Sequence, residues 1–173
     1  TGLTLRQKDP TINLVGYDKD KVVRNRAKKI GLCKVESNLD NAVSGSQLII
    51  LCVPVGQMQA VTQRLKKIIE PGTTITDVGS VKLSVIEEIE SNIESVGGKY
   101  VPSHPIAGTE RSGPDAGYAG LFEGRWCILT PTRKTNKKAL NSLETFWKFL
   151  GMQTKIMTPE HHDLVLAVTS HAP

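Results

Sequence analysis

Short apolar runs alternate with amphipathic stretches along most of this 173-residue chain. The clearest run, QLIILCV at 47–53, is continuously hydrophobic, which is typical of a strand covered on both faces of its sheet. Further strands are expected at 11–17, 73–76, 100–103, 126–129 and 154–157, and helices at 19–30, 58–69, 81–93, 137–150 and from 158 onward. Strands that alternate with helices predict an α/β, doubly wound fold with a mainly parallel sheet.

The composition is that of one globular domain with a hydrophobic core, since 39% of the residues are hydrophobic and 23% are charged. No apolar run approaches the roughly 20 residues that span a bilayer, and the first residues lack the apolar stretch of a signal peptide. The three cysteines are far apart in the sequence. Cys52 and Cys127 lie in apolar runs, which predicts small buried thiols in a reducing, cytoplasmic compartment.

The formal net charge of +5 raises the question of a nucleic-acid partner. The positive residues are scattered, acidic residues interrupt the first group of them, and aromatic residues make up only 5% of the chain. Because a single-strand platform interleaves aromatic with basic residues, we expect a solvated surface and no nucleic-acid partner. A mild positive field also suits an anionic substrate and a dinucleotide.

Ligands of such sheets bind outside the carboxyl ends of the strands, so the residues that follow each strand are the first candidates. Asp18 follows the strand at 11–17, where an acid hydrogen-bonds the adenosine ribose of NAD and repels the 2′-phosphate of NADP. No arginine stands at the next two positions, which favours NAD. The alternative is that Asp18 only caps the following helix. Val53 and Pro54, after the central strand, are either a plain loop or a backbone contact to the nucleotide.

The segment DVGSVK at 77–82 follows the next strand. Ser80 is placed to cap the helix expected from residue 81, and its hydroxyl can also face the crevice beside the reactive end of a cofactor. Lys82 reads as a solvated lysine in the first turn of that helix.

His104 stands at the end of the strand at 100–103 and opens a loop with two glycines. A histidine titrates near neutral pH, so it can take the proton of a hydroxyl while hydride leaves the same carbon. The alternative is a structural histidine. In the last helix, His162 and Asp163 cannot share a metal with His171, because neither pair has a suitable helical spacing, and no metal site is expected.

Several segments together resemble the prephenate and arogenate dehydrogenases, in the order in which that family carries them. They are VGYDKD (15–20), LIILCVPV (48–55), DVGSVK (77–82), SHPIAGTERSG (103–113), LFEGRWCILTPT (121–132) and TPEHHDLVLAVTSHAP (158–173). The resemblance covers essentially the whole chain. The HPIAGTE segment with a downstream SHxP is its specific part.

The resemblance implies an oxidoreductase of tyrosine biosynthesis with a Rossmann-like fold, which carries out the NAD-dependent oxidative decarboxylation of prephenate, or alternatively of arogenate. It makes His104 the catalytic histidine, assisted by Ser80. It places Thr109, Glu110 and His171 beside the substrate. On the cofactor side it places Asp18, Val53, Pro54, Asp77 and Lys82. It also implies a homodimer in the full-length protein.

The chain departs from the family pattern at both ends. Residues 1–7 resemble the interior of the helix that follows the family's first strand and glycine-rich turn, which are not in the sequence. We therefore expect an incomplete dinucleotide-binding domain at 1–157, with an unpaired or rearranged sheet edge, and at 158–173 the start of a helix that leads to an absent helical domain.

A folded but catalytically incompetent fragment is the alternative from another class. A β-hydroxyacid dehydrogenase does not predict HPIAGTE, and a regulatory module has no positive feature here.

Overall fold

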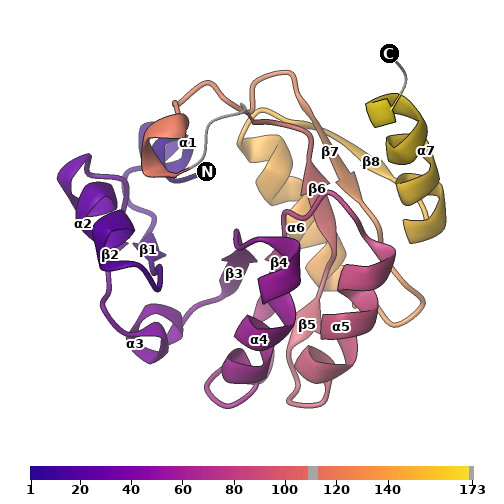
Figure 1. The fold of residues 1–173 in the computed structure, drawn as a ribbon, viewed down its shortest axis with the longest axis horizontal. Coiled ribbons are helices and arrows are strands. Elements are labelled where there is room, and N and C mark those ends of the chain that lie inside the picture. Colours follow the sequence, from indigo (N-terminus) through magenta and orange to yellow (C-terminus); the bar gives the residue numbers. More distant parts are fainter. Residues whose placement is uncertain (109–112, 172–173) are drawn as a thin grey trace.

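The computed structural model describes residues 1–108 and 113–171, with side chains in the last helix described as far as residue 168. Strands and helices alternate along the chain, as predicted (Figure 1). The elements in chain order are α1 (Gly2–Lys8), β1 (Val15–Gly16), α2 (Lys21–Lys29), β2 (Lys34–Val35), α3 (Leu39–Val43), β3 (Leu48–Leu51), α4 (Val55–Leu65), β4 (Thr74–Asp77), α5 (Leu83–Glu94), β5 (Lys99–Tyr100), β6 (Ser103–Pro105), the 3-10 turn η1 (Pro114–Ala116), β7 (Trp126–Leu129), α6 (Lys137–Phe149), β8 (Gln153–Ile156) and α7 (Pro159–His171).

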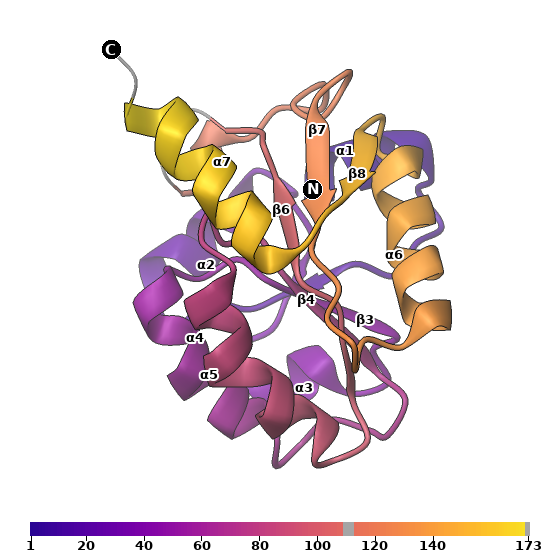
Figure 2. The same cartoon turned by 90° about the vertical axis from the view of Figure 1, so that its right-hand side faces the viewer.

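The strands form three hydrogen-bonded groups, ordered β1-β2, β3-β4-β5 and β6-β7-β8. Every pair is parallel except β6 and β7, so the predicted α/β fold with a mainly parallel sheet is confirmed. Only Val101 and Pro102 separate β5 from β6, which makes the single predicted strand at 100–103 two short ones. Figure 2 shows α4 and α5 on one side of the strands, α6 on the other, and α7 crossing beside β6.

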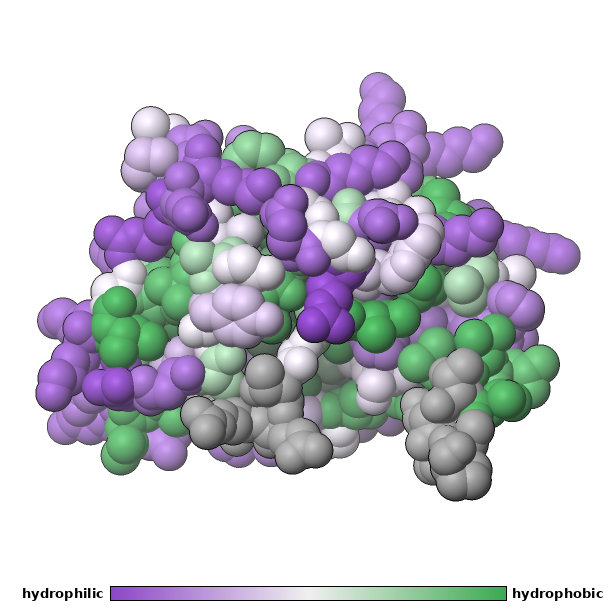
Figure 3. Space-filling view, turned by 90° about the horizontal axis from the view of Figure 1, so that it is seen from above, coloured by the Kyte–Doolittle hydropathy of each residue, from purple (hydrophilic) through white to green (hydrophobic). Residues whose placement is uncertain are grey.

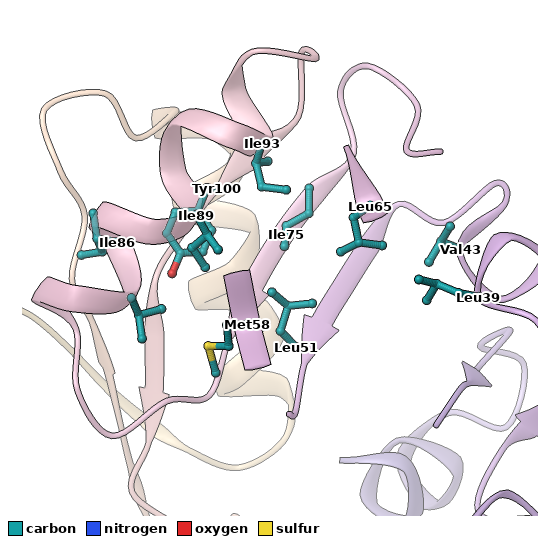
Figure 4. Packing of buried hydrophobic residues seen from close by; sticks show 11 residues of the cluster. Leu39, Val43, Leu51, Met58, Leu65, Ile75, Ile86, Ile89, Ile93 and Tyr100 are labelled. Atoms are coloured by element: carbon teal, nitrogen blue, oxygen red, sulfur yellow. The ribbon is translucent and has the colours of Figure 1, made fainter. Parts of the chain in front are cut away.

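Two hydrophobic clusters hold the layers together. The first lies between β3, β4 and the helices α4 and α5 (Figure 4), and consists of Leu39, Val43, Leu51, Met58, Leu65, Ile75, Val85, Ile86, Ile89, Ile93 and Tyr100. The second packs α6 against β7, with the fully buried Trp147 at its centre. Burying apolar surface in both clusters is the main force that seats the helices on the strands.

Polar side chains set where the helices begin. Asp20 caps α2, since its carboxylate accepts a hydrogen bond of 2.7 Å from the backbone N–H of Val22. Asn136 caps α6 in the same way, through the backbone N–H of Ala139 at 3.0 Å. The alternative that Asp18 caps α2 is therefore wrong, because Asp20 is the capping residue of that helix.

Two of the shortest elements were not predicted from the sequence. A two-residue strand, β2, and a five-residue helix, α3, contain too few residues to show a hydrophobic period. The predicted strand at 11–17 is reduced to β1, because β2 pairs with only two of its residues. Cys127 is buried as expected, but Cys52 is exposed, because β3 ends one residue before it.

The strands β1 and β3 each have one edge without a hydrogen-bonded neighbour within the described residues. β1 pairs only with β2, and β3 pairs only with β4, so the two groups stand apart in the sheet (Figure 1). The expected unpaired edge is thus present. In the same part of the chain, no helix combines the length and the hydrophobicity that a membrane span requires.

Candidate active site

A buried ion pair lies at the carboxyl end of β4. Asp77 and Lys82 are both fully buried, and the Lys82 ammonium contacts the Asp77 carboxylate directly. Burial lowers the pKa of Lys82, and the carboxylate of Asp77 partly offsets this effect. The prediction of a solvated lysine is wrong, because the turn before α5 folds Lys82 back under the strand ends.

The carboxylate of Asp77 also accepts hydrogen bonds from the Tyr100 hydroxyl at 2.7 Å and from the Gly79 N–H at 2.9 Å. Burial and the Asp77 charge raise the pKa of Tyr100 well above its usual value. The space at Gly79 is tight, since a Cβ there would lie 3.0 Å from the Asp77 carboxylate and 3.3 Å from Val55. Asp77 is therefore surrounded by protein donors and offers no open face to a cofactor.

This pair reaches the next strand through Ser103. The Lys82 ammonium donates to the Ser103 carbonyl at 2.9 Å, and the Ser103 hydroxyl donates to the Asp77 carbonyl at 2.9 Å. Since His104 follows Ser103 in β6, the buried ion pair fixes the backbone that carries the candidate catalytic histidine.

His104 contacts a second histidine that the sequence analysis did not assign to the site. Its Nδ1 lies 2.9 Å from Nε2 of His162 in α7, and the two rings meet edge to face with centroids 5.1 Å apart. His162 is fully buried, whereas His104 is 9% exposed. His162 Nδ1 lies 2.7 Å from the Asp163 carboxylate, so the three side chains form a continuous row.

The surroundings of His104 disfavour its charged form. Burial lowers the pKa of His104 to about 4, the neighbouring His162 and Lys82 add to this effect, and Asp77 and Asp163 oppose it. His104 is therefore an uncharged imidazole at neutral pH, which is the form that accepts a proton.

This shift predicts that stability depends on pH. Because the folded protein resists protonation of His104, the unfolded chain binds more protons between its ordinary pKa of 6.5 and the folded value of about 4. The free energy of unfolding should therefore fall by up to about 3 kcal/mol as the pH falls through this window. Urea unfolding at several pH values tests this, and His104→Asn should flatten the dependence; an equally steep decline in that variant would contradict the assignment.

Asp163 joins α7 to the start of α5. Its two carboxylate oxygens accept hydrogen bonds from the backbone N–H groups of Lys82 at 2.8 Å and Leu83 at 2.9 Å. Burial opposes ionisation of Asp163, but these bonds and the bond to His162 outweigh it and lower the pKa of the carboxyl group. The prediction that Ser80 caps this helix is wrong, since α5 begins two residues later and an acid from another helix caps it. Ser80 is exposed.

The candidate ribose contact lies on a separate part of the sheet. Asp18 is half-buried after β1, and its carboxylate accepts a 2.7 Å hydrogen bond from the Asp20 N–H. Arg24, on the first turns of α2, donates to the Asp18 carbonyl at 2.6 Å. The two positions after Asp18 hold no arginine, as the sequence analysis noted, but α2 brings Arg24 back to this strand end. Val53 is half-buried against the first cluster, and Pro54 is exposed before α4.

An ion pair connects α2, which follows Asp18, to the loop that follows His104. The Arg26 guanidinium in α2 contacts both carboxylate oxygens of Asp115 in η1, with Nε at 2.8 Å from each. The pair raises the pKa of Arg26 and lowers that of Asp115 through the shared hydrogen bonds. Two segments that are 89 residues apart in the sequence therefore meet across the carboxyl side of the sheet.

The remaining predicted residues receive no structural account. Thr109 and Glu110 lie outside the described residues, and the side chain of His171 is not described. In the part of the chain that is described, no three acidic, histidine or cysteine side chains are grouped as metal ligands would be. His162, Asp163 and Tyr100 are the site residues that the sequence analysis missed, and only the adjacency of His162 and Asp163 in the sequence gave any signal.

The fold and the site define a nucleotide-binding α/β domain of the dehydrogenase type, with a buried, uncharged histidine at the carboxyl side of its sheet. The model of the nucleotide-binding domain of prephenate dehydrogenase matches residues 1–156, and the chain belongs to this family.

Relatives and solved structures agree with this assignment. The chain is 42% identical to a cyclohexadienyl dehydrogenase of Zymomonas mobilis over 95% of its own length and 55% of the relative, and 33% identical to a prephenate dehydrogenase of Bacillus subtilis over 99% and 46%. It thus spans about half the length of these curated relatives.

Among solved structures, it resembles Aquifex aeolicus prephenate dehydrogenase in complex with hydroxyphenyl propionate and NAD+, with a TM-score of 0.90 and 31% identity, covering 98% of this chain and 59% of the other. Synechocystis arogenate dehydrogenase gives a TM-score of 0.89 at 26% identity, over 98% and 59% of the two chains.

Proposed function

We propose that the full-length protein is an oxidoreductase of tyrosine biosynthesis, which oxidatively decarboxylates prephenate to 4-hydroxyphenylpyruvate with NAD. The observation that carries this proposal is His104, a buried histidine held uncharged beside an ordered row of polar groups. The names of the relatives support the same reaction. We assign residues 1–157 to the dinucleotide-binding domain and 158–173 to the helix that continues from it.

His104 acts in this proposal as the base. Its unprotonated nitrogen accepts the proton of the ring hydroxyl as hydride leaves the same carbon. The bond to the ring carboxylate then breaks, its electron pair completes the aromatic ring, carbon dioxide leaves, and the proton returns to the phenolic oxygen. Because aromatisation drives the reaction, the protein supplies chiefly position and one base. Ser80 assists at the hydroxyl, and Thr109, Glu110 and His171 contact the substrate.

NAD, when bound, would accept the hydride. The chemistry of the residues at the strand ends fits this cofactor, because the half-buried Asp18 carboxylate is an acceptor for ribose hydroxyls. Val53 and Pro54 would lie along the nucleotide through their backbone. Asp77 and Lys82, which are buried and paired with each other, would support the strand ends from beneath the site.

Removing the Asp18 carboxylate should weaken the preference for NAD. In Asp18→Ala, Arg24 stays beside this strand end without the nearby negative charge, which favours a 2′-phosphate. We expect the ratio of kcat/KM for NAD to that for NADP to fall by about tenfold, the equivalent of 1.4 kcal/mol. Steady-state rates with both cofactors measure this, with Asp20→Ala as the neighbouring control. An unchanged ratio would remove Asp18 from cofactor selection.

Formation of NADH from NAD and prephenate by the full-length protein tests the proposed reaction directly. Arogenate is assayed in parallel, because relatives with either substrate in their names match this chain. Turnover of prephenate supports the proposal, and turnover of arogenate alone replaces its substrate. No turnover of either substrate with either cofactor would overturn the proposal.

The alternative for this 173-residue chain by itself is a folded but catalytically incompetent domain. The unpaired edges of β1 and β3 favour it, because no hydrogen bonds join these two groups of strands within the described residues. Calorimetric titration with NAD distinguishes the two, since tight, saturable binding by this chain would exclude the incompetent domain.

We also propose that the full-length protein is a homodimer. The exposed apolar side chains of α7, Leu164 at 64% and Val168 at 62%, support an interface on this helix. Figure 3 shows hydrophobic residues gathered beside the C-terminal end of the chain on the face above the strands. Light scattering on the full-length protein gives the mass that tests this.

A further inference from the structure

We infer that His162 and Asp163 are positioning residues that hold His104 in the one tautomer able to act as a base. This inference rests on the proposed function for its catalytic consequence, but the arrangement itself stands on the geometry of the three side chains.

The tautomers follow from the Asp163 end of the row. An ionised carboxylate only accepts hydrogen bonds, so the proton between Asp163 and His162 belongs to His162 Nδ1. The neutral His162 ring then has a lone pair on Nε2. His104 Nδ1, which lies 2.9 Å from that lone pair, must therefore be the donor. The lone pair of His104 is left on Nε2, on the side of the ring away from His162.

Asp163 can fix this direction because it is itself fixed. The backbone N–H groups of Lys82 and Leu83 hold both of its oxygens at the start of α5, and they favour its ionised form. A carboxylate that faced solvent would rotate and let either nitrogen of His162 carry the proton.

The same row can accept charge during the reaction. When His104 takes a proton on Nε2, its Nδ1 proton can pass to His162 Nε2, which places the positive charge next to the Asp163 carboxylate. The charged groups around these two rings are Lys82 before α5, Asp77 at the end of β4 and Asp163 in α7. Of these, Asp163 is the one in hydrogen-bond contact with His162.

A pair of substitutions separates this role from simple packing. In His162→Gln the side-chain oxygen can still accept from His104 Nδ1, whereas His162→Leu fills similar space without an acceptor. We expect His162→Leu to lower kcat for NAD-dependent oxidation by about 100-fold or more, because the wrong tautomer offers no lone pair to the substrate. His162→Gln should recover most of that loss, and KM for NAD should stay the same in both variants.

The decisive measurement is the protonation of the His104 ring by long-range proton–nitrogen correlation NMR, on the protein with its other histidines assigned by substitution. Protonated Nδ1 and bare Nε2 in the wild type, with the opposite tautomer or a mixture in His162→Leu, support the inference. Protonated Nε2 in the wild type overturns it. Equal kcat loss in the Gln and Leu variants, with an unchanged His104 tautomer, also overturns it, because packing would then explain the loss.

This readout does not depend on turnover. If the wild-type protein oxidises neither prephenate nor arogenate but shows the expected tautomer, the proposed function fails while the positioning of the His104 ring stands. Thermal unfolding of each variant, followed by circular dichroism, establishes that the comparison is made between folded proteins.

Discussion

His104→Asn should abolish most of the turnover of the full-length protein and leave its affinity for NAD nearly unchanged. Asparagine keeps a polar group of similar reach but has no nitrogen that accepts a proton, and a positioned general base contributes about 10²–10⁴-fold to rate. We therefore expect kcat to fall within or beyond that range. Steady-state NADH formation measures the loss, and a calorimetric titration with NAD shows that the cofactor side is intact.

The choice of control matters for this variant, because His104 is also a partner in a buried row. Ser80→Ala, which alters an exposed side chain near the same strand ends, should fold normally and lose less activity. A His104→Asn protein that turns over at the wild-type rate would remove His104 from the mechanism. A rate loss accompanied by an equal loss of NAD affinity would instead indicate a distorted site.

The second large effect concerns stability. In Lys82→Met the apolar part of the side chain is largely kept, but the buried Asp77 carboxylate loses its cation. Breaking one partner of a buried ion pair leaves an uncompensated charge, which costs about 3–5 kcal/mol. We expect the free energy of unfolding to fall by that amount in urea titrations followed by circular dichroism.

The double variant Asp77→Asn/Lys82→Met provides the matched control. The asparagine can still accept from the Gly79 N–H and donate to the Tyr100 hydroxyl, so no charge remains buried. The double variant should recover much of the stability that Lys82→Met loses, because replacing both members of a buried ion pair is often close to neutral. If Lys82→Met is as stable as the wild type, the prediction is wrong, and water must reach the Asp77 carboxylate in that variant.

The sequence predicted the elements whose pattern extends over enough residues. The strand at 126–129 has the predicted bounds, because its four residues form a continuous apolar run. The predicted helix at 137–150 ends one residue earlier in the structure, and its amphipathic pattern extends over three turns. His104 was expected just after a strand at 100–103, but it lies within the separate short strand β6. β2 and α3 were missed because two and five residues are too few to show a period.

What the sequence could not give was the tertiary packing around His104. Lys82 was expected in solvent, because a lysine in the first turn of a helix is ordinarily exposed, and only the packing of β4 against β6 buries it. His162 was considered only as a metal ligand. Its contact with His104 depends on β6 pairing antiparallel with β7, which carries β8 and then α7 to that side of the sheet. The local sequence pattern of a strand does not indicate which distant strand it pairs with.

The unpaired edges of β1 and β3 affect how the protein behaves at high concentration. Each edge presents backbone N–H and carbonyl groups that another extended chain can pair with, and strands of a second molecule are the nearest source. Leu48, Ile49 and Ile50 of β3 are only partly covered, so the edge is apolar as well as unpaired. Samples of this chain should therefore lose solubility as they are concentrated, and a short apolar peptide that adds one parallel strand should keep them in solution.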